Sequence, residues 1–350
     1  MVTPVEIGNR RVGPDQPCFI IAEAGVNHNG DLEMGRRLVD AAAAAGADAV
    51  KFQTFRAERL IIRKAPKAAY QLQTTDPEES QLEMLHKLEL SEQAHGELAS
   101  HCQKKGILFL STPFEEESAD FLEALGLPAF KIPSGELTNL PFLIHVARKG
   151  RPMIVSTGMS TLDEVEAAVK AIRGSGNSKL ILLHCVSNYP ANPEDVNLRV
   201  LSTLMETFQV PVGYSDHTTG IDISLGAVAL GASIIEKHLT LDRNLPGPDH
   251  RASLEPAELT ALVTGIRRVE SALGHGKKVP ANGEITISAV ARKSLVAARD
   301  LPAGTVLSPS DVAVKRPGTG IPPKDLNRVL GMKIHRTLSC DELLCWEDLK

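Results

Sequence analysis

The sequence predicts an α/β protein: a (β/α)8, or TIM, barrel followed by a small β-rich domain. Three observations lead to this fold class. Short apolar runs alternate with longer amphipathic segments through about the first 275 residues. They form eight pairs, the number that a (β/α)8 barrel requires. The apolar runs are almost uninterrupted, which is typical of parallel strands that are buried on both faces.

The strands are expected where the apolar runs occur, each bounded by Gly, Pro, Asn, Asp or charged residues. In chain order they are Cys18–Ala24, Ala49–Thr54, Leu108–Thr112, Ala129–Pro133, Met153–Thr157, Leu180–Val186, Val210–Ser215 and Ile234–Thr240. Before the first of them, Val5–Val12 predicts a hairpin around Gly8 and Asn9. We expect this hairpin to close the bottom of the barrel.

Helices are expected between the strands, because apolar residues recur there at helical spacing. The clearest are Leu32–Ala45, Ser91–Lys105, Glu115–Leu125, Thr161–Arg173 and Glu255–Leu273. Thr161 and Glu164 form a capping-box pattern at the start of one of them. The alternative fold is an open doubly wound sheet. However, the turn after the first strand reads AGVNHNG and lacks the G-x-G-x-x-G fingerprint of such sheets.

The pattern changes after Leu273, where residues 274–283 contain Gly, Lys and Pro without periodicity and predict a linker. We expect a catalytic domain over 1–275, which includes the hairpin, a linker over 276–287 and a second domain over 288–350. A unit this short has a thin core and is expected to lean on another surface. The polar segment Gln71–Glu83 predicts part of a loop over the barrel mouth.

The composition excludes several classes of function. With 38 Lys and Arg against 43 Asp and Glu, and only 4% aromatic residues, a nucleic-acid partner is not expected. Residues 1–14 lack an apolar signal core, and no apolar run is long enough to span a membrane, so no membrane partner is expected. The five scattered cysteines contain no C-x-x-C pair and predict free thiols in a cytoplasmic protein.

Every predicted strand ends in side chains that can bind or react, and in a barrel these ends share one face. In chain order they are Glu23; Lys51 and Gln53; Ser111 and Thr112; Lys131, Ser134 and Glu136; Ser156; His184, Ser187 and Tyr189; Ser215 and His217; and Glu236 and His238. One or two such groups could be satisfied inside the barrel, but groups on all eight strands predict a polar active site.

His217 and His238 lie on neighbouring predicted strands at matching depth, with Glu23 on the adjoining strand. They could share a divalent cation, and imidazole with carboxylate suits Mn, Fe, Co or Zn better than Mg. Few protein ligands leave coordination positions open for a substrate oxygen. The alternative is that each histidine is only hydrogen-bonded within the barrel.

Lys51 and Lys131, together with serines at four strand ends, predict a site for phosphate and carboxylate groups. The serines are Ser134, Ser156, Ser187 and Ser215. Each hydroxyl could instead cap a helix, and Lys131 could instead form a Schiff base, although a metal ion nearby would make that chemistry redundant. Asp249, in a loop stiffened by two prolines, is a candidate for binding sugar hydroxyls or else an exposed turn residue.

Taken together, these segments resemble the sialic acid synthase family, which comprises N-acetylneuraminate synthases and the related legionaminic and pseudaminic acid synthases. The stretches that carry the resemblance are residues 21–30, 51–54, 111–114, 131–136, 156–159, 213–218, 236–238 and 246–249. From about Ser288 the chain looks like the antifreeze-like (SAF, β-clip) domain that follows the barrel in this family, including residues 314–318.

The resemblance implies that the chain condenses phosphoenolpyruvate with an N-acetylhexosamine aldehyde, most commonly N-acetylmannosamine. The products are a nine-carbon 2-keto-3-deoxy sugar acid and phosphate. It also implies that His217 and His238 bind Mn²⁺, with Mg²⁺ or Co²⁺ as alternatives, and that Glu23 lies near the metal and the reacting carbons. A domain-swapped homodimer is implied as well.

The remaining roles also follow from the resemblance alone. Lys51 and Thr112 match positions near the phosphoenolpyruvate carboxylate; Lys131, Ser134, Ser156, Ser187 and Ser215 match the phosphate pocket; Gln53, Glu136, Tyr189 and Asp249 match acceptor positions; and Arg316 of the partner chain matches the residue that reaches the N-acetyl group.

One departure leaves the acceptor open. Many bacterial N-acetylneuraminate synthases have Asn where this chain has Ser187, whereas legionaminic- and pseudaminic-type synthases often have Ser. A diacetamido-trideoxyhexose is therefore the alternative acceptor. Two other classes also compete: a metal-dependent pyruvate aldolase, and a non-enzymatic protein that binds carbohydrate or ice.

Overall fold

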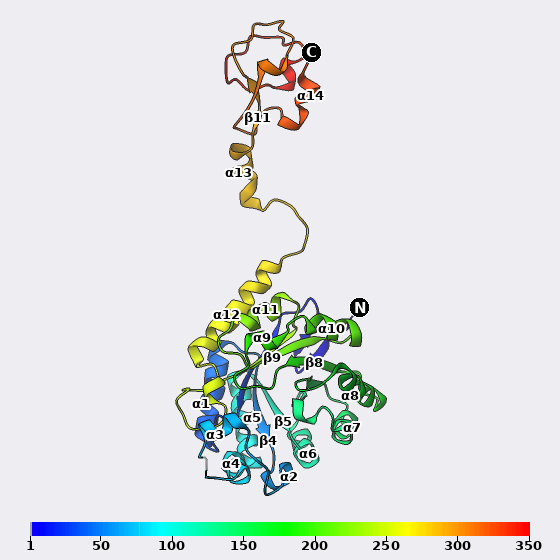
Figure 1. The fold of residues 1–350 in the computed structure, drawn as a ribbon, viewed down its shortest axis with the longest axis vertical. Helices are drawn as coiled ribbons and strands as arrows, with labels where there is room; N and C mark the ends of the chain where they lie inside the picture. Colours follow the sequence, from blue (N-terminus) through cyan, green and yellow to red (C-terminus); the bar gives the residue numbers. More distant parts are fainter. Residues whose placement is uncertain (1, 77) are drawn as a thin grey trace. The chain divides into compact units, whose positions relative to one another are not determined.

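The computed structural model describes residues 2–76 and 78–350 and divides into two compact units (Figure 1). Unit 1 is Met1–Gly274 and unit 2 is His275–Lys350. Residue 1 of the expected catalytic domain and residue 77 of the expected loop lie outside the described residues. Each unit is described by itself below.

Eight parallel strands form the centre of unit 1 (Figure 1). They are β3 (Phe19–Gly25), β4 (Ala49–Thr54), β5 (Leu108–Pro113), β6 (Phe130–Ile132), β7 (Met153–Ser156), β8 (Leu180–Cys185), β9 (Val212–Asp216) and β10 (Ile234–His238). Their order is β5-β4-β3-β10-β9-β8-β7-β6, and β5 also contacts β6, which closes the sheet into a barrel. The predicted (β/α)8 fold is confirmed, with every strand within two residues of its expected bounds.

Eight longer helices surround the barrel, each following a strand in the chain. They are α1 (Leu32–Ala45), α5 (Glu92–Lys105), α6 (Glu116–Leu125), α7 (Leu140–Arg148), α8 (Leu162–Gly174), α10 (Val200–Phe208), α11 (Asp222–Ala229) and α12 (Pro256–Leu273). Local residues determine their ends. For example, the Asp31 side chain accepts hydrogen bonds from two amides at the start of α1, and Gly46 ends that helix at a φ of +82°. The predicted capping box of Thr161 and Glu164 is also present.

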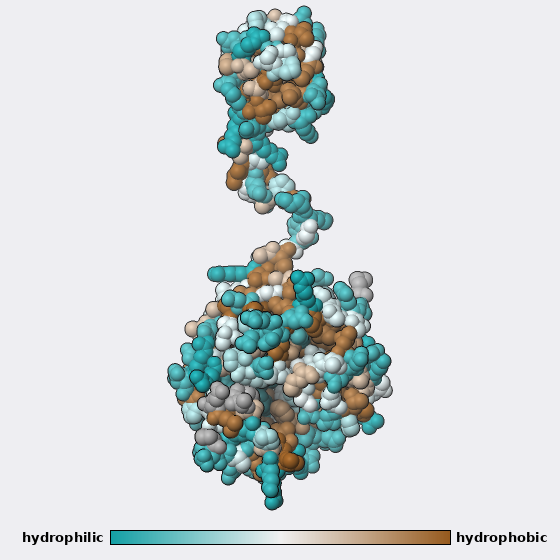
Figure 2. All heavy atoms as spheres, viewed as in Figure 1, coloured by the Kyte–Doolittle hydropathy of each residue, from teal (hydrophilic) through white to brown (hydrophobic). Residues whose placement is uncertain are grey.

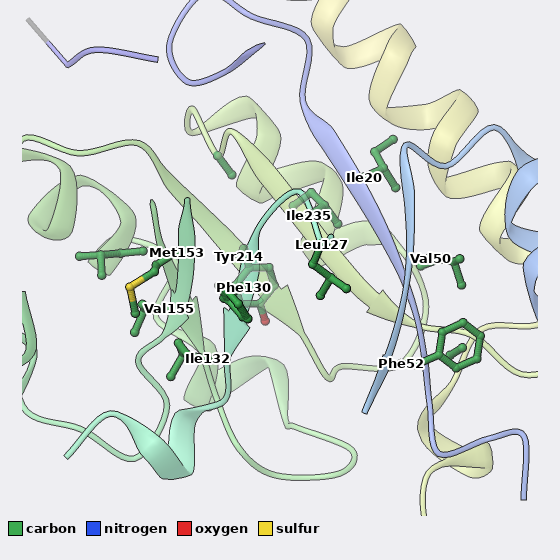
Figure 3. Close-up of a cluster of buried hydrophobic side chains, with 14 of the residues drawn as sticks. Ile20, Val50, Phe52, Leu127, Phe130, Ile132, Met153, Val155, Tyr214 and Ile235 are labelled. Carbon is green, nitrogen blue, oxygen red and sulfur yellow. The ribbon is translucent and has the colours of Figure 1, made fainter. Parts of the chain in front are cut away.

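The core has two layers. One set of strand residues packs in a cluster with residues of the surrounding helices; Figure 3 shows members of this cluster, among them Ile20, Val50, Phe130 and Tyr214. Strand residues that face inward form a second cluster, which includes Phe19, Leu110 and Ile234. Three residues of the hairpin formed by β1 (Val5–Ile7) and β2 (Arg10–Val12) join this inner cluster: Val5, Ile7 and Val12. The hairpin thus closes the barrel bottom as expected and leaves the carboxyl ends of the strands as the open end.

The expected loop over Gln71–Glu83 is wrong in part, because helices occupy both of its ends. The chain between β4 and α5 contains α2 (Ala57–Leu60), α3 (Ala69–Thr74) and α4 (Gln81–Leu88). The side chains of Ser80 and Glu83 form a capping box that starts α4. Met84 and Leu88 on the same helix are buried in a small apolar cluster, and this packing stabilises the helix.

Unit 2 has its own core, built from short elements. The strands β11 (Ser294–Ala297) and β12 (Val312–Lys315) pair antiparallel, and the helices are α13 (Asn282–Ala291) and α14 (Leu326–Val329). The first half of α13 lies inside the expected linker, because the Glu284 carboxylate accepts the Ala281 amide and starts a helix there. Across the part of the chain that the structure describes, no helix is long and apolar enough to cross a membrane.

The helix α13 is unusual because none of its side chains is buried against the residues that the structure describes. Ile285, Ile287 and Val290 are 60%, 62% and 69% exposed, and Figure 2 shows apolar side chains along this segment.

Candidate active site

A cavity of about 430 Å³ opens at the carboxyl ends of the barrel strands. All the residues that were given a role above except Glu136 and Arg316 line it, whereas Ser111 and His184 from the strand ends do not. Those that line it are Glu23, Lys51, Gln53, Thr112, Lys131, Ser134, Ser156, Ser187, Tyr189, Ser215, His217, His238 and Asp249. The side chains come from all eight strands or the loops that follow them, because parallel strands of a barrel end on one face.

Glu136 and Arg316 are not among the lining residues. Glu136 follows β6 in a single 3-10 turn, and its carboxylate accepts a hydrogen bond from Asn139 Nδ2 at 2.7 Å instead of lining the described cavity. Arg316 directly follows β12 in unit 2, where its side chain is exposed.

Two buried lysines and two buried glutamates alternate across the floor of the cavity. Lys51 forms an ion pair with Glu23, donates to Thr112 Oγ1 at 3.0 Å, and lies 3.8 Å from a carboxylate oxygen of Glu236. Lys131 donates to the other oxygen of Glu236 at 3.0 Å. Each of these four charged side chains is at most 6% exposed, so their charges interact through protein rather than through water.

The two glutamates have opposite pKa shifts. Burial raises the pKa of Glu23 to about 7, even though Lys51 opposes the shift. Burial also acts to raise the pKa of Glu236, but Lys131 and Lys51 outweigh it and hold the value at about 2. Glu236 is therefore ionised at neutral pH, whereas Glu23 can hold or release a proton there. Two carboxyl groups with separated pKa values are typical of acid and base roles in enzymes.

The two histidines face each other with their ring centroids 5.5 Å apart. His217 Nδ1 lies 2.7 Å from the carbonyl oxygen of Val186, which can only accept, so this nitrogen carries the proton and Nε2 is free to act as a ligand. His238 Nδ1 is buried and has no hydrogen-bond partner among the described residues. Burial and the neighbouring His217 keep the pKa of His238 well below its usual range, so its imidazole is neutral.

This donor set fits a divalent transition-metal ion. A neutral imidazole with an unpartnered nitrogen, and a second imidazole oriented by a backbone carbonyl, are common features of such sites. Three further side chains, Glu58, His86 and Glu89, also lie close enough to share an ion, but they form ion pairs with one another and two of them are exposed. The histidines at the barrel end are the better candidates.

A second subsite is lined by serine hydroxyls. The amide of Gly158 donates to Ser134 Oγ at 3.0 Å, and a Cβ at this position would lie 2.3 Å from Ser187 Oγ. The hydroxyls of Ser134 and Ser187 thus both lie close to the backbone of Gly158, where a side chain would displace them. Ser156 Oγ is buried without a hydrogen-bond partner in the described chain, whereas Ser215 donates to Glu236 at 2.9 Å. An unpaired buried hydroxyl in a cavity that two lysines also line suits an anionic ligand.

Tyr189 and Asp249 complete the polar side of the cavity. The Tyr189 ring lies 4.1 Å from the His217 ring, and Asp249 lies 4.0 Å from His238 Nδ1. Asp249 is only 7% exposed, so its alternative interpretation as an exposed turn residue is wrong. Burial raises the pKa of Asp249 to about 6.

Sequence reasoning missed two features of the cavity. Glu236 was recognised only as a group at a strand end, and no role was predicted for it. The second feature is an apolar wall, which we define as Val26, Phe55, Leu60, Ile61, Met84, Leu85, Leu88 and Phe114. The helical spacing of Met84 and Leu88 was the available signal for this wall, and the polar residues before them obscured it.

Comparisons with known proteins agree with this geometry. Residues 38–278 match the NeuB family, and residues 292–350 match the SAF domain. Two curated relatives are each named N,N'-diacetyllegionaminic acid synthase. The protein from Legionella pneumophila is 49% identical over 97% of this chain and 96% of its own length, and that from Campylobacter jejuni is 50% identical over 93% and 98%. The solved N-acetylneuraminic acid (sialic acid) synthetase of Leptospira borgpetersenii has a TM-score of 0.74 and 39% identity, covering 82% of this chain and 95% of that one.

Proposed function

The chain belongs to the NeuB family, and from that premise we propose that it condenses phosphoenolpyruvate with an acetamido sugar aldehyde and releases phosphate. The observation that carries this proposal is the cavity itself. One cavity brings His217 and the neutral His238 next to two buried lysines and an unpaired serine hydroxyl. A metal subsite beside an anion subsite is what an anionic enol donor and a carbonyl acceptor require.

In this proposal His217 and His238 hold the divalent ion, Mn²⁺ or else Mg²⁺ or Co²⁺. When bound, such an ion supplies Lewis-acid polarisation of a carbonyl oxygen. The chain's own residues do the rest of the work. Lys51, with Thr112 beside it, binds the donor carboxylate, and Lys131 with the serines binds its phosphate. Because both anions are held by fixed cations, the donor is oriented for attack without further ordering.

The atoms balance as follows. The methylene carbon of phosphoenolpyruvate bonds to the aldehyde carbon, water adds at the adjoining carbon, and phosphate leaves from that carbon. The added water loses both of its protons as that carbon becomes the keto group: one proton ends on the aldehyde oxygen, and the other leaves with the phosphate. Glu23 is the group proposed to handle these protons, because its pKa of about 7 lets it exist in both forms at neutral pH. Glu236 remains ionised and holds both lysines in place.

Two acceptors are candidates, and the apolar wall favours one of them. N-acetylmannosamine presents hydroxyl groups on its distal carbons. A diacetamido-trideoxyhexose instead carries a second acetamido group and a methyl group. Contact of these groups with apolar side chains buries apolar surface and makes the binding free energy more favourable. The two relatives named as N,N'-diacetyllegionaminic acid synthases support the same choice. We therefore place the diacetamido sugar first and N-acetylmannosamine second.

A phosphate-release assay with each acceptor tests this choice. Leu85 on α4 lines the cavity, so Leu85→Gln is expected to lower kcat/KM for the diacetamido sugar by about tenfold, the effect of losing one apolar contact. The value for N-acetylmannosamine should change much less. Leu82→Gln on the same helix is the matched control, since Leu82 does not line the described cavity. Equal losses for both acceptors would show that the wall does not contact the acceptor's distal groups.

We also propose a domain-swapped homodimer in which Arg316 of one chain completes the site of the other. The exposed aliphatic side chains of α13 and the small core of unit 2 support this assembly. The five free thiols are consistent with a cytoplasmic enzyme.

Arg316→Ala is expected to weaken binding of the acceptor by about ten- to a hundredfold, or roughly 1.5–3 kcal/mol, because one hydrogen bond from a charged donor is lost. The KM for phosphoenolpyruvate should not change.

Co-expression of two impaired chains tests the swap, with the acceptor kept far below the KM of the Arg316→Ala chain so that neither parent is appreciably active. Arg316→Ala chains with His217→Ala chains should recover about a quarter of wild-type activity, because half of randomly paired dimers contain one intact site of two. Heterodimers that form and stay inactive, while each parent folds normally, would show that the site is not shared between chains.

A further inference from the structure

Two buried, oppositely charged side chains lie directly next to the two histidines in the chain. Asp216 precedes His217 at the end of β9, and Lys237 precedes His238 at the end of β10. Successive residues of a strand point to opposite faces. Asp216 and Lys237 therefore point outward to the helix layer, while the histidines line the cavity. Both charged side chains are 0% exposed.

The ion pair between Asp216 and Lys237 links the ends of β9 and β10. Lys237 and Asp216 are register partners on the adjacent strands, and Lys237 Nζ donates to Asp216 Oδ2 at 2.8 Å. The same ammonium group donates to the carbonyl oxygen of Thr218 at 2.6 Å. One cation thus contacts the residue before His217 and the residue after it.

Asp216 is the centre of a fully paired network. Its Oδ1 accepts from the amide of Thr218 and from the Thr218 hydroxyl, both at 2.8 Å, and its Oδ2 accepts from Ser224 Oγ of α11 at 2.6 Å. The Tyr214 hydroxyl adds a longer contact at 3.3 Å. These directional bonds hold the turn at residues 216–218 against both β10 and α11.

Stability of the barrel does not explain this arrangement. Replacing a buried ion pair by apolar side chains of similar size is often neutral or stabilising, because desolvation of the charges is costly. Apolar contacts, however, do not determine the position of a turn as directional hydrogen bonds do. Neither Asp216 nor Lys237 lines the described cavity, so neither contacts a ligand there.

We propose that Asp216 and Lys237 are a positioning pair, which sets the separation and orientation of His217 and His238 and thereby the affinity for the divalent ion. The inference rests on the proposed function, since it requires that the two histidines bind a metal. Groups that orient metal ligands in other proteins change metal affinity by about 10- to 100-fold. The pair acts through the backbone on either side of His217 and through the neighbouring position of His238.

The test uses the full-length double variant Asp216→Leu with Lys237→Met, in which no unpaired charge is left buried. Its Mn²⁺ dissociation constant, measured by electron paramagnetic resonance of the free ion, is expected to rise at least about tenfold. At saturating Mn²⁺ its KM for phosphoenolpyruvate should stay near the wild-type value, because the lysines and serines of the anion subsite are untouched. A thermal melt checks that the variant folds.

Two further variants sharpen the result. Ser224→Ala leaves both charges in place and removes one donor to Asp216, so it keeps the proposal testable if the double variant does not fold; its Mn²⁺ dissociation constant should rise several-fold. Tyr214→Phe is the matched control, because it removes only the long contact and should bind Mn²⁺ like the wild type.

The outcomes separate this inference from the proposed function. If the wild type binds Mn²⁺ through His217 and His238 but a folded double variant, or Ser224→Ala, binds it with unchanged affinity, the positioning role is overturned and the metal site stands. If the wild type binds no Mn²⁺ that depends on these histidines, the metal site falls and this inference falls with it.

Discussion

His238→Ala is expected to lower the rate of phosphate release by about a thousandfold or more at saturating substrate. The imidazole is proposed to hold the ion that stabilises charge on the aldehyde oxygen, and losing several kcal/mol of such stabilisation corresponds to that factor. Removal of the metal by a chelator should have the same effect on the wild type. The measurement is the initial rate of phosphate release with Mn²⁺, together with a melting curve to show that the variant folds.

His184→Ala is the matched control for this prediction. His184 also lies at the end of a strand, β8, but its Nε2 is held by the Val196 carbonyl oxygen at 2.5 Å and it does not line the described cavity. Its loss should change the rate by only a few-fold. Full activity of His238→Ala in chelated buffer would show that the reaction does not require a metal ion bound by His238.

Lys131→Met is expected to reduce kcat/KM for phosphoenolpyruvate by at least about a hundredfold, because the lysine is proposed to bind the phosphate through charged hydrogen bonds. It should also destabilise the fold by about 3 kcal/mol, since Glu236 loses its 3.0 Å partner and keeps only Lys51 and Ser215. Steady-state kinetics and thermal melts measure the two effects separately.

The double variant Lys131→Met with Glu236→Leu separates binding from stability. Removing the carboxylate together with its partner should restore much of the melting temperature, because no unpaired charge is then buried. Binding of phosphoenolpyruvate should not return. An unchanged KM in Lys131→Met would show that the phosphate is bound elsewhere.

A chemical test at Lys131 distinguishes anion binding from Schiff-base formation. Treatment with borohydride in the presence of substrates is expected to leave Lys131 unmodified, because its ammonium group is paired with Glu236 and serves to bind an anion. A reduced covalent adduct on Lys131, detected by peptide mass spectrometry, would instead establish a Schiff-base mechanism.

Much of the site could be predicted because a barrel converts sequence spacing into proximity. Lys51 and Gln53 lie two residues apart on β4, and both reach the cavity at the end where all eight strands finish. The period of two and the rule that active sites occupy the carboxyl ends required no knowledge of the tertiary structure. The same reasoning brought His217 and His238 together, since their strands are neighbours in the sheet.

The rest depended on distances across the barrel, which spacing along a strand does not give. Glu236 can pair with both Lys51 and Lys131 because β10 lies opposite β6 across the barrel interior. Lys131 Nζ is 3.0 Å from Glu236 Oε1 as a result. The apolar wall depends on α4. This short helix is stabilised by tertiary contacts, because its Met84 and Leu88 pack against residues of the segment that follows β4. Glu136 was expected to reach the acceptor because of its motif, but a 3-10 turn directs its carboxylate to Asn139. Its contact with the acceptor stays a prediction.

The most direct test of the central claim compares two donors with the same purified chain. Phosphoenolpyruvate or pyruvate is supplied with Mn²⁺ and an acetamido sugar acceptor, and inorganic phosphate and 2-keto-3-deoxy sugar acid are measured together. The account predicts equal amounts of phosphate and sugar acid from phosphoenolpyruvate, and no product from pyruvate. Sugar acid formed from pyruvate, or phosphate released without an acceptor, would contradict it, because the cavity would then be the site of an aldolase or of a phosphatase.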